Sequence, residues 1–508
     1  AKLRRRPTLP LIAAGIAVMS LAVAVGGYRW LASGKESTKG NAAQVKPSAE
    51  DAPVAEPTSV AVLPFVNMSP DPNQEYFSDG LSEELLNVLS NVPQLRVISR
   101  TSSFQFKGKS EDVRAIGRKL NVAHVLEGSV RKSGKRIRIT AQLVEAATGS
   151  HLWSQTYDRD LEDIFAIQDD IARSVANASR VTLLGVEGRP PASHAGNAEA
   201  YNLFLQAKHF TRRGTRESLE KAIGYYEQAL RLEPGRAVYW AGLAGVHTRQ
   251  VNHGFIPEEE GIRQSRAEVT RALELDPKLA EAHALLGFIR LTHDWDWEGA
   301  GASSKQALEY GPGSSMVVGN AASLAAALGR LDEALELNRR AIRLDPLNVA
   351  PHFNLSQAAA DVGRLEEAEA ALRKVLELNP DQPAAHAALG RVFLQQAQPR
   401  AALEEFQKET IPSDRRQGLA LAYHALGKTS DADAALAELI EKDGESAAMR
   451  IAEVYAGRQE PGRVFEWLER AYTRRDPELA FIKGNSLFRN LEGDPRYRAL
   501  LKKMRLPA

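Results

Sequence analysis

The chain has 508 residues, of which 44% are hydrophobic and 25% charged; this composition is typical of globular domains and excludes wholesale disorder. Lysine and arginine (65) balance aspartate and glutamate (64), which argues against a chain built to coat nucleic acid. There is no cysteine, so disulfides, thiolate metal sites and cysteine nucleophiles are excluded.

The chain opens with an apolar run. Residues 9–25 carry no charged side chain, and the run extended to Tyr28 reaches about 20 residues, which is long enough to cross a membrane. We predict a basic cytoplasmic tail at 1–8, a transmembrane helix at 9–31 and a flexible linker at 32–58. The positive-inside rule then predicts a single-pass protein of the bacterial inner membrane with its bulk in the periplasm. The alternative is a cleaved signal peptide that ends near Gly26.

Residues 59–185 predict a small α/β domain. Strands are predicted at 59–65, 95–99, 122–131, 136–145 and 151–157, and helices at 79–89, 112–120 and 161–183. Lys132-Ser133-Gly134-Lys135 is a hairpin signal between two strands that alternate with period two. This order of elements predicts a mixed sheet with helices packed on it.

Three stretches of this region resemble the TolB-like amino-terminal domain. They read SVAVLPFVNMSPDPNQEYFSDGLSEELLNVLS, VISRTSSFQFKGK and VLEGSVRKSGKRIRITAQLVEAATGSHLWSQTYDRDLEDIFAIQDDIA. The resemblance implies a domain placed between a membrane span and tetratricopeptide repeats. It also implies that many such proteins carry a winged-helix or class III adenylate cyclase domain upstream of the span. Only eight residues precede the apolar run here, so neither domain is expected in this chain.

The α/β region lacks the motifs of common enzymes. It has no G-x-x-x-x-G-K-[ST], G-x-S-x-G or H-E-x-x-H sequence. His124 and His151 fall within predicted strands, where a structural histidine is the simpler interpretation. We therefore predict no catalytic residue, no metal, no cofactor and no enzymatic activity. An exported hydrolase would need a convergent polar site, and an upstream cyclase domain would change the prediction.

The second half of the chain is repetitive. The pattern Ala-Leu-x-Leu-x-Pro recurs with prolines separated by 43, 35, 34 and 34 residues, at Pro234, Pro277, Pro312, Pro346 and Pro380. A period of 34 residues with a proline after the second helix resembles the tetratricopeptide repeat. We predict repeats at 198–445, and a degenerate repeat with capping helices at 446–508. The longer first spacing predicts an extended loop near 251–257.

Two further patterns in the repeats have a structural and a functional interpretation. His283, His352 and His386 each follow a repeat proline by six residues, but successive repeats hold them too far apart to share one metal ion. Trp295 and Trp297 could grip a ligand, although packing at a helix turn is the simpler interpretation.

The resemblance to tetratricopeptide repeats implies that the first helix of each pair faces the partner. By the proline phase, these side chains are Val238, Ala241, Arg249, Glu281, Phe288, Leu291, Met316, Phe353, Gln357, Arg391 and Leu394. They are mostly neutral, and the Lys/Asn cluster that clamps a peptide carboxylate is missing, so a protein segment or helix fits better than a charged tail. Alternatively, this face packs against the chain's own tail at 492–506.

Together these patterns predict a multidomain protein: one transmembrane helix, a small α/β mixed-sheet domain and an all-α tetratricopeptide-repeat solenoid. Its predicted function is a membrane-anchored, exported scaffold or sensor that binds a protein or peptide partner, without nucleic acid contact from these residues. The alternative is the exported sensory part of a transmembrane transcriptional regulator or adenylate cyclase whose cytoplasmic output domain is missing from this chain.

Overall fold

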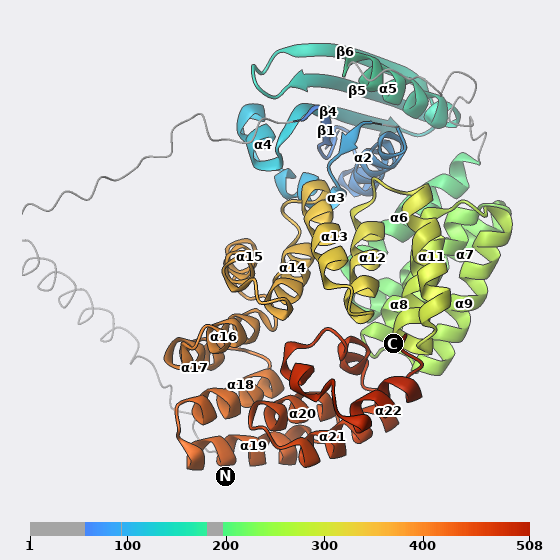
Figure 1. Ribbon diagram of the computed structural model, residues 1–508. Coiled ribbons are helices and arrows are strands. Elements are labelled where there is room, and N and C mark those ends of the chain that lie inside the picture. Colours follow the sequence, from blue (N-terminus) through green and yellow to red (C-terminus); the bar gives the residue numbers. More distant parts are fainter. Residues whose placement is uncertain (1–55, 93, 180–196, 508) are drawn as a thin grey trace, which may run out of the picture. The chain divides into compact units, whose positions relative to one another are not determined.

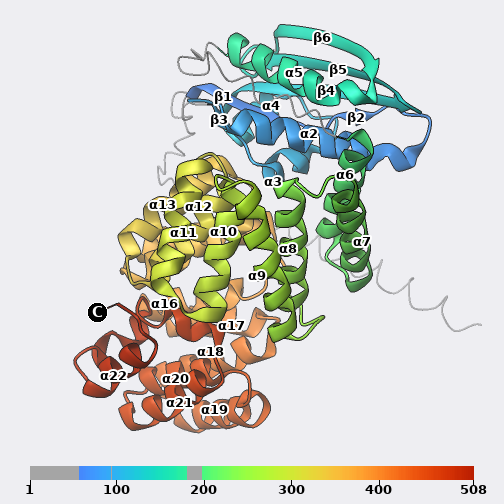
Figure 2. The same cartoon turned by 90° about the vertical axis from the view of Figure 1, so that its right-hand side faces the viewer.

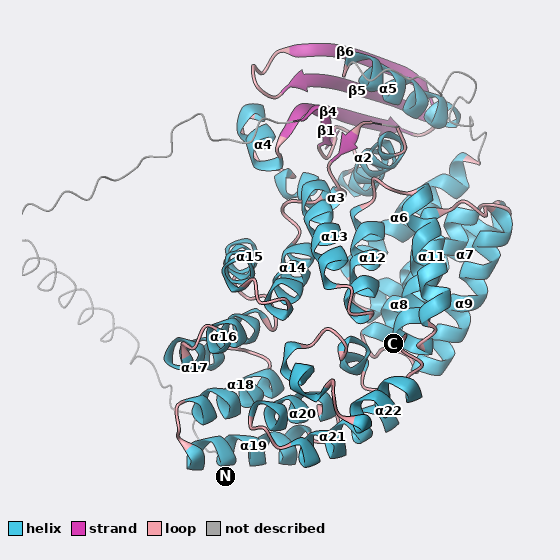
Figure 3. Cartoon of the chain, viewed as in Figure 1, coloured by secondary structure: helices cyan, strands magenta, loops and turns pink. Residues whose placement is uncertain are grey.

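The computed structural model describes residues 56–92, 94–179 and 197–507. All of them belong to one compact unit, which extends over 54–508. Within this unit, a small α/β domain is followed in sequence by a long series of paired helices (Figures 1 and 3).

A mixed six-stranded sheet forms the centre of the α/β domain. Its strands are β1 (Glu56–Val62), β2 (Val66–Asn67), β3 (Arg96–Val97), β4 (Val122–Ser133), β5 (Arg136–Glu145) and β6 (His151–Asp160). The order is β3-β1-β4-β5-β6, with β2 beside β4. β1 runs parallel to β3 and β4, whereas β4, β5 and β6 form an antiparallel meander. The predicted mixed sheet is confirmed.

The alternation of side chains along β1 explains how helices cover both faces of this sheet. The domain's helices are α2 (Glu75–Ser90), α3 (Arg100–Ser103), α4 (Val113–Leu120) and α5 (Ile164–Ala178). Val60 and Val62 join one buried cluster with Leu81 of α2 and other residues of α2 and α5. Ala61, which points the opposite way, belongs to a second cluster with Ile116 of α4. Successive residues of one strand therefore hold helices on opposite faces.

The rest of the chain folds into antiparallel helix pairs (Figure 2). The helices are α6 (Ala198–Arg213), α7 (Arg216–Leu232), α8 (Ala237–Asn252), α9 (Glu258–Leu275), α10 (Ala280–Ile289), α11 (Trp297–Tyr310), α12 (Ser315–Ala327), α13 (Leu331–Leu344), α14 (Val349–Asp361), α15 (Leu365–Leu378), α16 (Ala385–Gln395), α17 (Pro399–Lys408), α18 (Pro412–Ala425), α19 (Thr429–Asp443), α20 (Ala448–Gly457), α21 (Pro461–Thr473) and α22 (Pro495–Lys503). The all-α solenoid predicted from the 34-residue period is confirmed.

The extra residues of the first repeat spacing mostly lengthen helices. α8 and α9 have 16 and 18 residues, whereas α14 and α15 have 13 and 14. Only His253–Pro257 remain between α8 and α9, so the extended loop predicted there is a short connection.

The predicted membrane span requires a correction. No helix in the described ranges 56–92, 94–179 and 197–507 is long and apolar enough to cross a membrane. The longest described helix, α9, has 18 residues, and its first turn contains three glutamates. Such charged side chains are expected where one face of a helix meets water. The fold class with one transmembrane helix, and the single-pass location in the bacterial inner membrane with a periplasmic bulk, are therefore wrong on this finding. The run at 9–31 lies outside the described residues.

Several polar contacts join the α/β domain to the helix pairs, and two of them centre on a buried carboxylate. At the first, Glu83 of α2 forms ion pairs with Arg100, at 2.8 Å, with Lys208 of α6, at 2.7 Å, and with Arg212 of α6. The side chain of Glu83 is only 13% exposed, so these pairs are shielded from bulk water. The helix α6 is thereby fixed on α2.

At the second contact, Asp345 between α13 and α14 receives hydrogen bonds from α3. The Ser102 backbone N–H and hydroxyl donate to Asp345 Oδ1 at 2.9 and 2.5 Å, and Asn348 Nδ2 donates to Oδ2 at 2.9 Å. Asp345 is 1% exposed. Two of these three donors to the buried carboxylate come from Ser102. The carboxylate is therefore fully hydrogen-bonded only while the α/β domain stays packed on the helix pairs.

Residues after α21 fold back onto the helix pairs. They form two 3-10 helices, Pro477–Phe481 and Ser486–Leu491, followed by α22. Trp297 Nε1–H donates to the Met504 carbonyl at 2.7 Å, across 207 residues of sequence. Trp295 and Trp297 are 7% and 4% exposed in this cluster, so the packing interpretation of the tryptophan pair is confirmed.

Candidate functional site

A large cavity lies against the first helices of successive pairs. It measures about 700 Å³ and is lined by residues of α12, α14, α16, α18 and α20, and by the segment 477–487. We call it the central cavity. Small side chains such as Ala326 and Ala388 line it beside larger polar ones. A cavity of this size takes a peptide side chain together with part of its main chain.

The predicted partner-facing residues are only partly gathered in cavities. Phe353, Gln357, Arg391 and Leu394 line the central cavity. Phe288 and Leu291 line a second, apolar cavity of about 200 Å³, between α10, α11 and α12. The remaining predicted residues lie outside both cavities; they are Val238, Ala241, Arg249, Glu281 and Met316.

The segment 477–491 forms one wall of the central cavity. Ser486 N–H donates to Asp361 Oδ1 at 3.1 Å, and Arg489 donates to the Asp361 carbonyl. Asn485 Nδ2 donates to Glu453 Oε1 at 2.5 Å. The alternative prediction was that the partner-facing surface of the repeats packs against the tail at 492–506. In the structure, the residues that pack there are 477–491.

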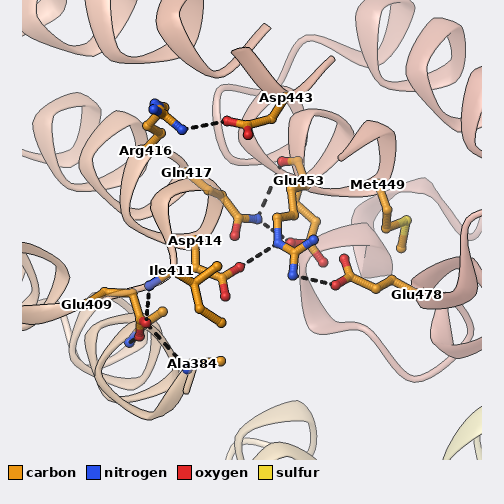
Figure 4. Close-up of polar contacts among 12 residues, drawn as sticks. Ala384, Glu409, Ile411, Asp414, Arg416, Gln417, Asp443, Met449, Glu453 and Glu478 are labelled. Carbon is orange, nitrogen blue, oxygen red and sulfur yellow. Dashed lines mark hydrogen bonds and ion pairs between the residues drawn. The ribbon is translucent and has the colours of Figure 1, made fainter. Parts of the chain in front are cut away.

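A network of carboxylates and amides forms the floor of the central cavity (Figure 4). Asp414 Oδ1 accepts from Arg450 Nε at 2.5 Å, and Arg450 Nη2 pairs with Glu478 Oε1 at 2.6 Å. Gln417 Nε2 donates to Glu453 Oε2. Figure 4 shows Gln417 and Glu453 pointing toward each other from α18 and α20.

Local structure explains how α16 and α18 reach the cavity at fixed positions. The buried carboxylate of Glu409 accepts from the N–H group of Ile411 at 2.9 Å (Figure 4). It also accepts from the N–H group of Ala387 at 3.0 Å. Both are otherwise unpaired donors at helix starts, so one side chain caps two helices. Gly390 and Gly418 leave room for the ring of Phe406, because a Cβ on Gly418 would lie 2.0 Å from it.

Two carboxyl groups of this cavity have raised pKa values. Burial, with the nearby charge of Glu453, raises the pKa of Asp361 to about 6, although Ser486 and Arg391 lower it. Burial, with the charges of Glu453, Asp476 and Asp414, raises the pKa of Glu478 to about 7 against the effect of Arg450. Burial is the larger cause of both shifts, and the neighbouring carboxylates add to it.

These shifts predict that both carboxyl groups lose their protons near pH 6 to 7 in the folded protein. The raised pKa of Asp361 favours the folded protein at low pH, and this contribution is lost as the pH rises from about 4 through about 6. For Glu478 the loss extends to about pH 7. Carboxyl ¹³C NMR should show both transitions, and D361N should remove the one near pH 6. D332N, which changes an exposed carboxylate on α13, should leave both unchanged; persistence of both in D361N would contradict the assignment.

Arg391 and Gln357 line the central cavity without a hydrogen-bond partner among the described residues. Neither forms a hydrogen bond or ion pair with any other residue of the described ranges; the charge of Arg391 lies near Asp361. Polar groups that are left without partners in a cavity are available to a ligand.

The histidines singled out in the repeats make local contacts. His283 Nε2 and His352 Nε2 lie 2.8 and 3.0 Å from the carbonyls of Pro277 and Pro346, and His386 Nδ1 lies 2.7 Å from Glu405. Across the residues that the structure describes, no three histidine or acidic side chains are grouped so that they could hold a metal ion. The six-residue spacing therefore marks a hydrogen bond within a repeat.

The cavity residues that the sequence missed fall into two groups. Asp361 lies one helical turn after Gln357 on α14, so a search four residues further along the same face would have found it. Glu453 and Glu478 lie where the 34-residue pattern has faded, and no periodic signal points to them.

Comparison with known families identifies two regions of the chain. Residues 296–349, 325–392 and 359–408 match tetratricopeptide repeats. Residues 296–408 are tetratricopeptide repeats. Residues 56–174 match the family described as the HilA/YgeH-like transcriptional regulator, second domain. The α/β domain is therefore similar to a domain of transcriptional regulators, and the match does not show a TolB-like domain.

One curated relative is a protein of Rhizobium meliloti (strain 1021) named "Putative adenylate cyclase 3". It is 40% identical over 230 residues, which are 45% of this chain and 39% of the relative. The chain therefore matches about two-fifths of the length of that protein.

Among solved structures, the type IV pilus biogenesis factor PilW is 24% identical, covering 42% of this chain and 95% of its own, with a TM-score of 0.37. PilF of Pseudomonas aeruginosa is 18% identical, covering 40% of this chain and 90% of its own, with a TM-score of 0.34. Tetratricopeptide repeats are suited to protein–protein interaction and are typically non-catalytic.

Proposed function

We propose that the protein binds a segment of a protein partner in the central cavity and carries out no chemistry there. The observation that carries the proposal is a cavity of about 700 Å³ on the first helices of the repeats, in which Arg391 and Gln357 have no partner among the described residues. Of the side chains predicted to face the partner, we propose that Phe353, Gln357, Arg391 and Leu394 contact it.

The size and chemistry of the cavity support a segment of chain over a small polar metabolite. Its lining mixes apolar side chains with amides and charges from five first helices, as in repeat surfaces that hold an extended or helical segment. The folded wall at 477–491 limits what fits, because Leu479, Ile482 and Phe488 are fully buried and hold this segment in place.

A blocking substitution tests the proposal. Random-sequence peptides displayed on phage are selected on the intact chain, and the enriched peptides are synthesised for fluorescence anisotropy. We expect Gln357→Trp, which fills the cavity from an exposed position, to weaken binding at least about tenfold.

The matched control is Gln228→Trp, an exposed glutamine on α7 outside the cavity, which should bind like the unmodified protein. Equal binding by both variants would contradict the proposed site.

We also propose a second, broader role, in which the chain is the regulatory part of a longer transcriptional regulator or adenylate cyclase. The family match at 56–174 and the named relative support it. In this proposal residues 59–185 relay the signal, the repeats at 198–445 receive it, and 446–508 cap them. N-terminal sequencing and the intact mass of the native protein test it. A winged-helix or cyclase domain ahead of Ala1 is expected, and a native protein that starts at Ala1 would contradict the proposal.

A further inference from the structure

The charged side chains that line the central cavity are unequal in number. Four are carboxylates, namely Asp361, Asp414, Glu453 and Glu478, and two are guanidinium groups, namely Arg391 and Arg450. Arg450 serves both Asp414 and Glu478. Negative charge is therefore in excess in a region that is partly shielded from water.

Glu453 forms no ion pair with any of the described residues, although the charge of Arg450 acts on it. Its two oxygens accept hydrogen bonds from the neutral amides of Gln417 and Asn485. Its charge also acts on both Asp361 and Glu478, and it raises the pKa of each. Hydrogen bonds from neutral amides solvate a carboxylate but leave its charge in place.

Asp414 adds an independent observation. Its side chain is 3% exposed, and its Oδ2 atom has no hydrogen-bond partner among the described residues, while Oδ1 is bound by Arg450. A buried acceptor left unpaired is costly unless a donor reaches it. Asp414 thus brings to the cavity a buried acceptor that no donor of the described residues reaches.

An apolar cavity adjoins the acidic one. Ser323 and Phe481 line both, and Phe481 is 39% exposed between them. The second cavity measures about 200 Å³, roughly the room that one leucine or phenylalanine side chain needs, and its lining includes Phe288, Leu291 and Leu324. The two cavities together present an acidic and an apolar site side by side.

We propose that the partner segment inserts a lysine or arginine side chain into the acidic central cavity and a leucine-sized apolar side chain into the adjoining cavity. This inference rests on the proposed peptide-binding function and specifies its partner. An acidic ligand would meet Arg391, but that charge already lies near Asp361, and three other carboxylates would repel the ligand.

The test uses the intact chain and the phage-selected peptides. We expect the enriched sequences to contain a basic residue at a fixed distance from an apolar one. The Glu453→Gln variant, which removes one charge with little change of shape, should bind such a peptide at least about tenfold more weakly. An analogue with norleucine for lysine, or citrulline for arginine, should lose affinity for the unmodified protein but little for Glu453→Gln.

Glu466→Gln on α21, where Glu466 pairs only with exposed arginines of its own helix, is the control and should bind normally. If Glu453→Gln lowers the melting temperature, Gln357→Lys replaces it, because this variant places a fixed cation at an exposed position of the cavity and should weaken binding of the basic peptide to a similar extent.

The outcomes separate this inference from the proposed function. Peptides without a basic residue, or unchanged affinity in Glu453→Gln and Gln357→Lys, would overturn the inference while Gln357→Trp still blocked binding. Peptides whose binding survives Gln357→Trp would contradict the proposed site and the inference together.

Discussion

The Phe488→Ala variant is expected to unfold with a free energy about 4 kcal/mol lower than that of the unmodified protein. Phe488 is 0% exposed and lies in the buried cluster that joins α20, α21 and the residues after them, including Leu479 and Tyr497. Truncation of a buried phenylalanine removes its transfer free energy and leaves a cavity that the surroundings fill only in part. Urea unfolding followed by circular dichroism measures the loss.

The same variant should also weaken peptide binding, because Ser486 and Leu487, which precede Phe488, line the central cavity. Leu232→Ala is the control: Leu232 is 41% exposed on α7, and its loss should change the free energy of unfolding by about 0.5 kcal/mol or less. A loss in Phe488→Ala no larger than this would show that the segment 477–491 does not support the fold.

Replacement of Asp345 by alanine is expected to lower the free energy of unfolding by about 3 kcal/mol. The substitution leaves the Ser102 N–H and hydroxyl and the Asn348 amide without their acceptor in a buried interface. Calorimetry should still show one transition, at a lower temperature, because the ion pairs of Glu83 with α6 continue to join the α/β domain to the helix pairs.

Asp276 provides a matched control for this experiment. It precedes a repeat proline as Asp345 does, but it is exposed and its side chain accepts only from Lys278 N–H, at 3.0 Å, a backbone group two residues away. Asp276→Ala should therefore cost about 1 kcal/mol at most. Equal losses in the two variants would mean that Asp345 acts only within its own repeat.

The regular parts of the fold could be predicted because their signal is local. Val60, Ala61 and Val62 alternate along one strand, and that alternation already assigns them to opposite faces of a sheet. The proline spacing likewise defines the helix pairs, since each repeat packs against its neighbours. Phe353 and Arg391 could be placed on the cavity for the same reason.

The remainder of the site depends on contacts between residues far apart in the sequence. Ser486 meets Asp361 across 125 residues, and Trp297 meets Met504 across 207. Contacts between such distant residues produce no periodic pattern in the sequence. The wall of the central cavity and its acidic floor were therefore not predicted. The sequence predicted that Trp295 and Trp297 are packing residues. It did not predict that they pack against the C-terminal residues.

The hydrogen bond between Trp297 and Met504 has a consequence for the order of events during synthesis. In a solenoid, each repeat can fold as soon as it leaves the ribosome, because it needs only its neighbours. Here the third helix pair acquires its last packing partner only after some two hundred further residues have been translated. Until then, the Trp297 indole lacks the C-terminal residues that cover it in the complete chain. A chaperone can cover this apolar surface before the residues around Met504 have been translated.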